Sequence, residues 1–223
     1  MGAAGGVVAL ICFSSYRKYI WFFGGKRLTL RRETEKHHIM IKEILRFNKE
    51  FVENKGYEKY LTSKYPDKKL AILTCMDTRL TMLLPAALGL KNGDVKLIKN
   101  AGGLVSGPFD SSMRSLLVGV YELGVEEIMV VAHSDCGACH LSGKEMRELM
   151  LERGIEEKVI ETVERSGTDI VGWLEGFHDT EASVRRSVGL IRNHPLMPKD
   201  VRVSGYVIDS ETGLLSEIDC REV

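Results

Sequence analysis

The prediction of the fold starts from two stretches, Leu70-Ala-Ile-Leu-Thr-Cys75-Met-Asp77-Thr-Arg79 and Ile128-Met-Val-Val-Ala-His133-Ser-Asp-Cys136. Each begins with a short, uncharged run rich in aliphatic and β-branched residues, which is typical of a buried strand in a parallel sheet. Each run ends in a residue that can bind a soft metal ion. Because ligands bind at the carboxyl ends of the strands in open α/β sheets, we expect Cys75, His133 and Cys136 to meet at one edge of a sheet.

Patterns typical of strands and helices alternate along the rest of the chain. A strand is predicted at residues 95–98, and a helix is predicted between the capping residue Asp110 and Gly124. Further helices are predicted at residues 144–152, 155–165 and 181–192, and further strands at 201–208 and 214–218. This alternation predicts an α/β fold with a mostly parallel central β-sheet flanked by helices.

The composition is that of an ordinary soluble globular protein. The chain has 223 residues, of which 44% are hydrophobic and 28% are charged, enough for one domain with an appendage. The formal net charge is zero, so nothing favours a nucleic-acid partner or an acidic membrane. Five cysteines, an odd number, argue against a disulfide framework and for a reducing compartment, which predicts a cytoplasmic protein.

Residues 1–39 show no hydrophobic period that links them to a core, so they are predicted to be an N-terminal extension outside the fold. The apolar run at residues 2–13 is shorter than the about 20 residues that span a bilayer. Basic residues follow this run, whereas in a signal peptide they precede it. Three interpretations stay open: a stretch upstream of a true start at Met40, a targeting segment, or a membrane-surface anchor.

The folded domain is predicted to cover residues 40–223 and to begin with an amphipathic helix. Apolar residues recur at helical spacing, and Asn54-Lys-Gly56 is a stop signal for the helix. The apolar positions are Ile41, Ile44, Leu45, Phe51 and Val52. Such a helix packs either on its own sheet or on a partner subunit, and the sequence leaves both open.

The three metal-binding residues suggest a zinc site with room for a reactant. Two thiolates and one imidazole leave the fourth position of a tetrahedral Zn²⁺ open, which is typical of catalytic sites. Asp77 and Arg79 follow Cys75 at alternate positions, so on an extended segment the three side chains share a face. An ion pair between Asp77 and Arg79 would keep the carboxylate near the metal. Asp135 either accepts a hydrogen bond behind a ligand or caps the next helix, and we favour the cap.

These motifs resemble those of the β-class carbonic anhydrases, especially the small, minimal members of that family. Cys-x-Asp-x-Arg at Cys75, His-x-x-Cys at His133 and Asn100-Ala-Gly-Gly103 occur in the family's order, and the resemblance runs from about Met40 to the C-terminus. It implies that residues 40–223 form a zinc domain and that Cys75, His133 and Cys136 bind the ion. The glycines suit a close backbone approach or a positive φ beside the site, although an ordinary turn is an equal alternative.

The resemblance also implies an activity, that of a lyase that converts carbon dioxide reversibly to bicarbonate. Zinc-bound hydroxide would attack carbon dioxide, Asp77 would accept the hydrogen bond of the hydroxide, and Arg79 would orient Asp77. The family pairs through its N-terminal helices and a sheet edge, so a homodimer is expected.

Two alternatives remain. Carbon disulfide and carbonyl sulfide hydrolases resemble this site pattern equally well. Cys136-Gly-Ala-Cys139 is a Cys-x-x-Cys motif, which suits a thiol redox protein or, with His133 and His140, a closed structural zinc site. That second interpretation leaves Asp77 and Arg79 unexplained. The family more often has methionine where this chain has Cys139, which adds a thiol that oxidation can reach.

Overall fold

The computed structural model describes residues 31–221 and 223, and for residues 31–39 it describes the backbone alone. The described residues fall into two compact units that divide between Lys59 and Tyr60. The first contains helix α1 (Arg31–Glu53). No helix of the described residues has both the length and the apolar character needed to cross a membrane.

The sequence predicted that the first helix starts at Met40. Helix α1 begins nine residues earlier, at Arg31. The stop signal is confirmed, since the helix ends at Glu53 and Lys55 adopts a left-handed φ of 54°. The boundary between extension and folded domain predicted at Met40 lies inside this helix and stays a prediction. The three interpretations of residues 1–39 depend mainly on residues 1–30, which lie outside the described part.

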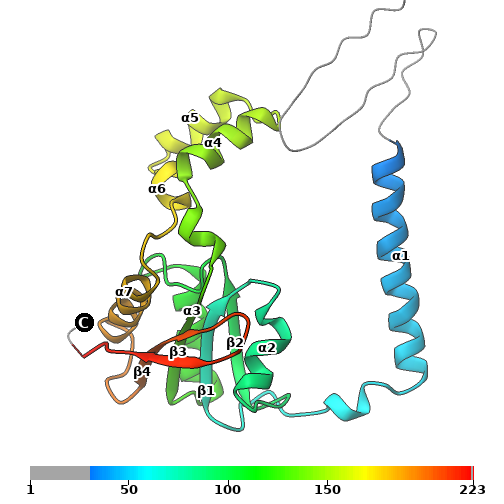
Figure 1. Cartoon of the computed structure of the whole chain (residues 1–223), viewed down its shortest axis with the longest axis vertical. Coiled ribbons are helices and arrows are strands. Elements are labelled where there is room, and N and C mark those ends of the chain that lie inside the picture. Colours follow the sequence, from blue (N-terminus) through cyan, green and yellow to red (C-terminus); the bar gives the residue numbers. More distant parts are fainter. Residues whose placement is uncertain (1–30, 222) are drawn as a thin grey trace, which may run out of the picture. The chain divides into compact units, whose positions relative to one another are not determined.

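The second unit is built on one five-stranded sheet with the order β2-β1-β3-β4-β5 (Figure 1). The first four strands are parallel and β5 is antiparallel to β4, so the predicted α/β fold with a mostly parallel sheet is confirmed. The elements are β1 (Leu70–Cys75), α2 (Leu80–Ala87), β2 (Val95–Asn100), α3 (Ser111–Leu123), β3 (Glu127–His133), η2 (Gly137–His140), α4 (Gly143–Glu152), α5 (Glu157–Arg165), α6 (Ile170–Leu174), α7 (Thr180–Arg192), β4 (Arg202–Ile208) and β5 (Leu215–Ile218).

Both faces of the sheet are covered, which explains why its central strands are apolar without interruption. Helices α3 and α7 pack on one face, where Leu73 of β1 belongs to the same buried cluster as Leu116 and Val188. Helix α2 packs on the opposite face, where Ile72 meets Leu80 and Leu84. Successive residues of β1 therefore face two different cores, and a charge at any of these positions would be buried.

The ends of the crossover helix α3 were predicted from its capping residues. The Asp110 carboxylate accepts a hydrogen bond from the Met113 amide at 2.7 Å, and Gly124 closes the helix with a left-handed φ of 70°. The short helix α6 was not predicted, because five residues are too few for a helical period to show. Since the caps set where α3 ends, they also set where β3 begins and hence where His133 lies.

Candidate metal centre

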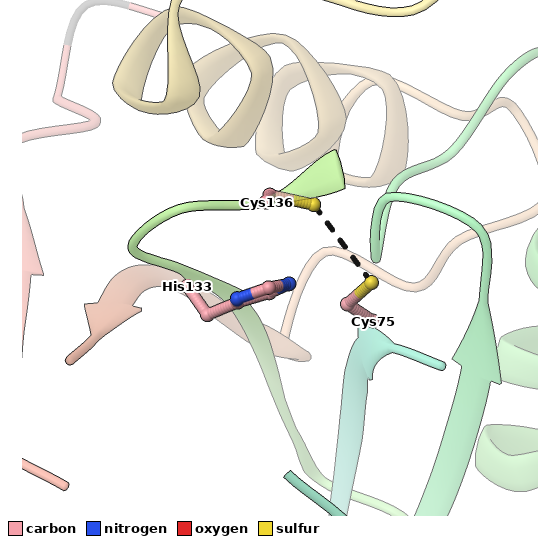
Figure 2. A group of neighbouring side chains, drawn as sticks. All are labelled: Cys75, His133 and Cys136. Carbon is pink, nitrogen blue, oxygen red and sulfur yellow. Dashed lines mark hydrogen bonds between the residues drawn. The ribbon is translucent and has the colours of Figure 1, made fainter. Parts of the chain in front are cut away.

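The register of the sheet brings the ends of β1 and β3 side by side. Thr74 lies opposite Val131, and its hydroxyl donates a hydrogen bond to the Val131 carbonyl at 2.8 Å. Cys75, one residue after Thr74, and His133, two residues after Val131, are the last residues of their strands and therefore reach the same carboxyl edge of the sheet. Cys136 returns to this edge after a tight turn. The convergence expected from the sequence is present, because the ligand atoms of the three residues all lie within 4.8 Å of one another (Figure 2).

The spacing of the two sulfur atoms fits a tetrahedral zinc ion. Cys75 Sγ and Cys136 Sγ are 3.9 Å apart, and both side chains are buried. Two thiolates on one tetrahedral Zn²⁺, each about 2.3 Å from the metal, would lie about 3.8 Å apart. The two cysteines could therefore hold the ion without rearrangement.

His133 presents a free lone pair to the same point. Its Nδ1 lies 2.8 Å from the Ser134 carbonyl oxygen, and because a carbonyl only accepts, Nδ1 carries the proton. In the neutral ring Nε2 is then unprotonated. Among the described residues it is the buried side-chain nitrogen or oxygen that lacks a hydrogen-bond partner. An unpaired buried polar atom is costly unless a ligand satisfies it, so this orphaned nitrogen fits a metal ligand.

The pKa values of the two thiols indicate that both ionise together only when a cation is bound. Burial favours the neutral Cys75 thiol, but the His133 ring and the amides of Asp77 and Gly102 outweigh burial and lower the pKa to about 7. Burial, reinforced by the nearby Cys75, raises the pKa of Cys136 to about 11. Two adjacent thiols therefore do not ionise together near neutral pH. A divalent cation would make both thiolates favourable, and its binding would release protons.

Asp77 and Arg79 form the ion pair predicted from the sequence. Arg79 donates from Nε to Oδ1 at 3.1 Å and from Nη2 to Oδ2 at 2.9 Å, and the Arg79 amide donates to Oδ1 at 2.8 Å. These bonds lower the pKa of Asp77 to about 2. Asp77 Oδ2 lies 3.9 Å from His133 Nε2 and is thus beside the ligand cluster.

The reason given for that pairing was wrong. Strand β1 ends at Cys75, residues 78–79 form a turn, and Arg79 has helical backbone angles directly before α2. The two side chains meet because the turn folds back on itself, and not because they alternate along a strand.

Asp135 does not cap a helix, so that interpretation was also wrong. The residue before η2 is Cys136, which makes no side-chain cap. Asp135 Oδ2 instead accepts a hydrogen bond from Arg79 Nη1 at 3.0 Å, and the Asp135 carbonyl accepts one from Arg79 Nη2 at 2.8 Å. No local signal in the sequence predicts a contact across 56 residues.

The loop Asn100-Ala-Gly-Gly103 forms a wall against Cys75. The Asn100 amide group donates to the Leu104 carbonyl at 2.7 Å, and its oxygen accepts from the Leu104 amide at 3.1 Å, which closes the loop. Gly102 and Gly103 both have positive φ, 88° and 65°. A Cβ on Gly103 would lie 2.6 Å from the Cys75 nitrogen. Close backbone approach and positive φ are both present, so an ordinary flexible turn does not account for these glycines.

Cys139 and His140 do not join the cluster. Cys139 Sγ lies 3.6 Å from the Thr180 hydroxyl of α7, and His140 is exposed. Within the described residues, the group close enough to hold a metal is Cys75, His133 and Cys136. The closed site built on the Cys-x-x-Cys motif is therefore not the one assembled here.

Comparisons with known proteins agree with this architecture. Residues 70–215 match the family model described as carbonic anhydrase. YtiB, a provisionally named carbonic anhydrase of Bacillus subtilis (strain 168), is 55% identical over 179 residues, which cover 80% of this chain and 96% of YtiB. A carbon disulfide hydrolase of Acidianus sp. (strain A1-3) is 32% identical over 158 residues, or 66% of this chain and 75% of that protein.

A solved structure shows the same fold. The crystal structure of β-carbonic anhydrase isoform I from Trichomonas vaginalis is similar with a TM-score of 0.72 and 35% identity, over 80% of this chain and 96% of that one. The resemblance inferred from the motifs is confirmed by the match of the family model and by these relatives. The chain belongs to the β-carbonic anhydrase family.

Proposed function

We propose that this chain catalyses the reversible hydration of carbon dioxide to bicarbonate, with zinc held by Cys75, His133 and Cys136. The observation that carries the proposal is the position of Asp77 Oδ2, 3.9 Å from the orphaned Nε2 of His133. A carboxylate held beside three buried soft donors suits the activation of a small nucleophile. A purely structural zinc site would need a fourth ligand instead.

The residues of the site divide the chemistry among them. When bound, zinc supplies a nucleophile from water by lowering the pKa of that water. With a pKa of about 2, the Asp77 carboxylate is ionised at neutral pH and can only accept hydrogen bonds. Asp77 therefore accepts the hydrogen bond of the nucleophile and aims its lone pair. Arg79 holds both oxygens of Asp77 in a fork and so fixes the direction in which that acceptor points.

The balance of charge suits a neutral substrate. Two thiolates compensate a divalent cation, and Arg79 compensates Asp77. With Asp135, which shares Arg79, these groups sum to one negative charge, so they offer no net positive charge that would bind an anionic substrate strongly. Carbon dioxide and carbon disulfide are both neutral, and carbon disulfide hydrolases are among the relatives of this chain. Hydrolysis of carbon disulfide is for this reason the second candidate function.

Stopped-flow measurement of carbon dioxide hydration by zinc-loaded protein tests the proposal, with carbon disulfide as comparison substrate. We expect hydration well above the uncatalysed rate, a large loss in Asp77→Asn with zinc retained, and parental activity in the control Cys139→Ser. Turnover of carbon disulfide without hydration of carbon dioxide would favour the second candidate. A zinc-loaded protein inactive on both substrates would contradict the proposal and favour a zinc-holding or thiol redox protein.

We also propose that the protein is a homodimer. The apolar face of α1 is exposed within the single chain, and five of its side chains are at least half exposed, namely Ile41, Ile44, Leu45, Phe47 and Val52. Such a face on a long helix is costly in water and suits contact with a second copy. Sedimentation at micromolar concentration should give twice the mass of the chain, and a monomer there would contradict the proposal.

The cytoplasm is the compartment we propose. All four cysteines among the described residues are free of disulfides, and two of them must be thiolates to hold the metal. Fractionation of the cells that make the protein would test this location.

A further inference from the structure

We propose that Asp135 is a positioning residue that holds the Arg79 guanidinium against Asp77 and joins the two loops that carry the metal ligands. Its effect on turnover rests on the proposed function, whereas the contact itself does not. Neither the sequence motif nor the family match identifies this residue, because the contact forms only when the ends of β1 and β3 lie side by side.

The hydrogen bonds of Arg79 account for almost all of its donors. A guanidinium has five N–H groups in one rigid plane. Two of them point to the Asp77 carboxylate, at 3.1 and 2.9 Å. One points to the Asp135 carboxylate at 3.0 Å, and one to the Asp135 carbonyl at 2.8 Å. Because the group is planar, fixing one edge on Asp135 fixes the direction of the edge that faces Asp77.

The pair of Asp77 and Arg79 needs such a support because its members are only two residues apart. The hydrogen bonds within the pair position its members relative to each other, whereas the bonds from Arg79 to Asp135 join the pair to the loop that carries Cys136. Asp135 lies between the candidate ligands His133 and Cys136 in the sequence. Its loop is in turn tied to β4, since the Ser134 amide donates to the Ile208 carbonyl at 3.0 Å. Asp135 therefore supplies the fixed point from which Arg79 and Asp77 are placed beside the ligands.

The backbone of Asp135 adopts a conformation that few residue types tolerate. Its φ is 51°, a left-handed value that aspartate and asparagine tolerate better than most residues with a side chain. The Asp135 side chain is 78% exposed, so its ion pair contributes little to stability. Orientation of Arg79 is the role that remains for a contact of this kind.

The left-handed φ supplies two well-matched variants. Asp135→Gly keeps the backbone without strain and removes the carboxylate, and Asp135→Asn keeps the shape and removes the charge. Asp219→Asn is the control, because Asp219 pairs with Arg221 through the same fork. The first measurement uses metal-free protein: the exchange rate of the Arg79 Nε proton with water, followed by ¹⁵N NMR. We expect faster exchange in both Asp135 variants and no change in the control.

The second measurement is the kcat and KM of the zinc-loaded variants. We expect kcat to fall about two- to fivefold in Asp135→Gly, the range of an exposed ion pair, with zinc content and KM unchanged. In an Arg79→Ala background the same substitution should have no further effect, which a merely structural role for Asp135 would not produce.

The outcomes separate the inference from the proposed function. Parental Nε exchange in both Asp135 variants would overturn the positioning role, whether or not the protein is active. Faster exchange in a parent protein that hydrates no carbon dioxide would keep the positioning role and contradict the proposed function. An effect of Asp135→Gly that is equally large without Arg79 would also overturn the inference.

Discussion

Two Asp-x-Arg ion pairs among the described residues have nearly the same geometry, and one of the two lies at the candidate site. Asp77 and Arg79 form a two-bond fork after β1, and Asp219 and Arg221 form one near the C-terminus. In both pairs the fork and an amide bond lower the pKa of the aspartate. A lowered pKa therefore does not mark the functional pair.

What differs is the surroundings of the two pairs. The side chain of Asp77 is 19% exposed and lies beside His133, whereas that of Asp219 is 57% exposed. Arg79 also reaches a second carboxylate, that of Asp135, on the loop between two candidate ligands. The comparison teaches that the motif becomes chemically useful through the metal ligands around it.

Removing a ligand should erase the difference between the two pairs, and it is the largest effect we expect. Cys75→Ser replaces a thiolate by a neutral hydroxyl, which is a poor zinc ligand, so zinc is lost and activity falls by at least about 100-fold. Elemental analysis and stopped-flow hydration check this. Full zinc occupancy in the variant would favour a site that uses Cys139 instead.

Matched substitutions in the two aspartates test the comparison directly. Asp77→Asn removes the ionised acceptor and should lower kcat roughly 100-fold with zinc retained, whereas Asp219→Asn should leave kcat unchanged. Stopped-flow kinetics with zinc analysis on both proteins provides the measurement. Equal effects of the two substitutions would show that the site around Asp77 has no special role.

The arginines should differ in their effect on the pH–rate profile. Asp77 has a pKa of about 2, so its protonation does not explain a loss of activity above pH 4. With zinc bound as proposed, the Asp77 carboxylate and hydroxide would compete for the open position of the metal. Hydroxide becomes scarcer as the pH falls, so activity should rise with pH along one apparent titration of the coupled site.

Arg79→Ala frees Asp77 for that open position and should lower activity at every pH, whereas Arg221→Ala should leave the profile unchanged. Profiles from about pH 5.5 to 8.5, about 1.5 units on either side of a pKa of about 7 for a zinc-bound water, decide the point. An Arg79→Ala protein with the parental profile and rate would rule out both the competition and the role of the pair.

Two glycines separate backbone strain from crowding at the site. Gly103→Ala combines a left-handed φ of 65° with a Cβ 2.6 Å from the Cys75 nitrogen. We expect a loss in the free energy of unfolding of about 1–2 kcal/mol from φ and about 1–3 kcal/mol from overlap. Gly89→Ala has a φ of 63° and no atom within 4 Å, so only the first loss applies. Urea denaturation should show a larger loss in the free energy of unfolding for Gly103→Ala than for Gly89→Ala. Equal losses would show that the loop at residues 100–103 shifts to relieve the overlap.

The smallest effect should come from the N-terminal part. A chain that begins at Met40 keeps the apolar face of α1 and every residue of the candidate site. We expect it to fold, bind zinc and hydrate carbon dioxide like the parent. Loss of solubility or activity on removal of residues 1–39 would show that they belong to the fold.

The strands and the candidate ligands could be predicted from the order of the residues alone. A strand buried on both faces of a parallel sheet is apolar along its whole length, so β1 and β3 can be recognised as apolar runs. The first residue after each run that can bind a metal marks the carboxyl end of the strand. The caps at Asp110 and Gly124 are local hydrogen bonds and backbone angles, so they too could be predicted. The same local logic explains why Asp77 and Arg79 could be paired, although the turn that joins them was misjudged.

Contacts between groups far apart in the chain became visible in the folded protein alone. The register of β1 on β3 places Cys75 beside Cys136 and brings Asp135 to Arg79, and Cys139 contacts Thr180 of α7 instead of the cluster. Asp135 has the sequence context of a helix cap, and what overrides it is a guanidinium 56 residues away. Such contacts depend on the relative position of two loops. That position is set by the packing of the whole sheet and leaves no periodic signal in the sequence.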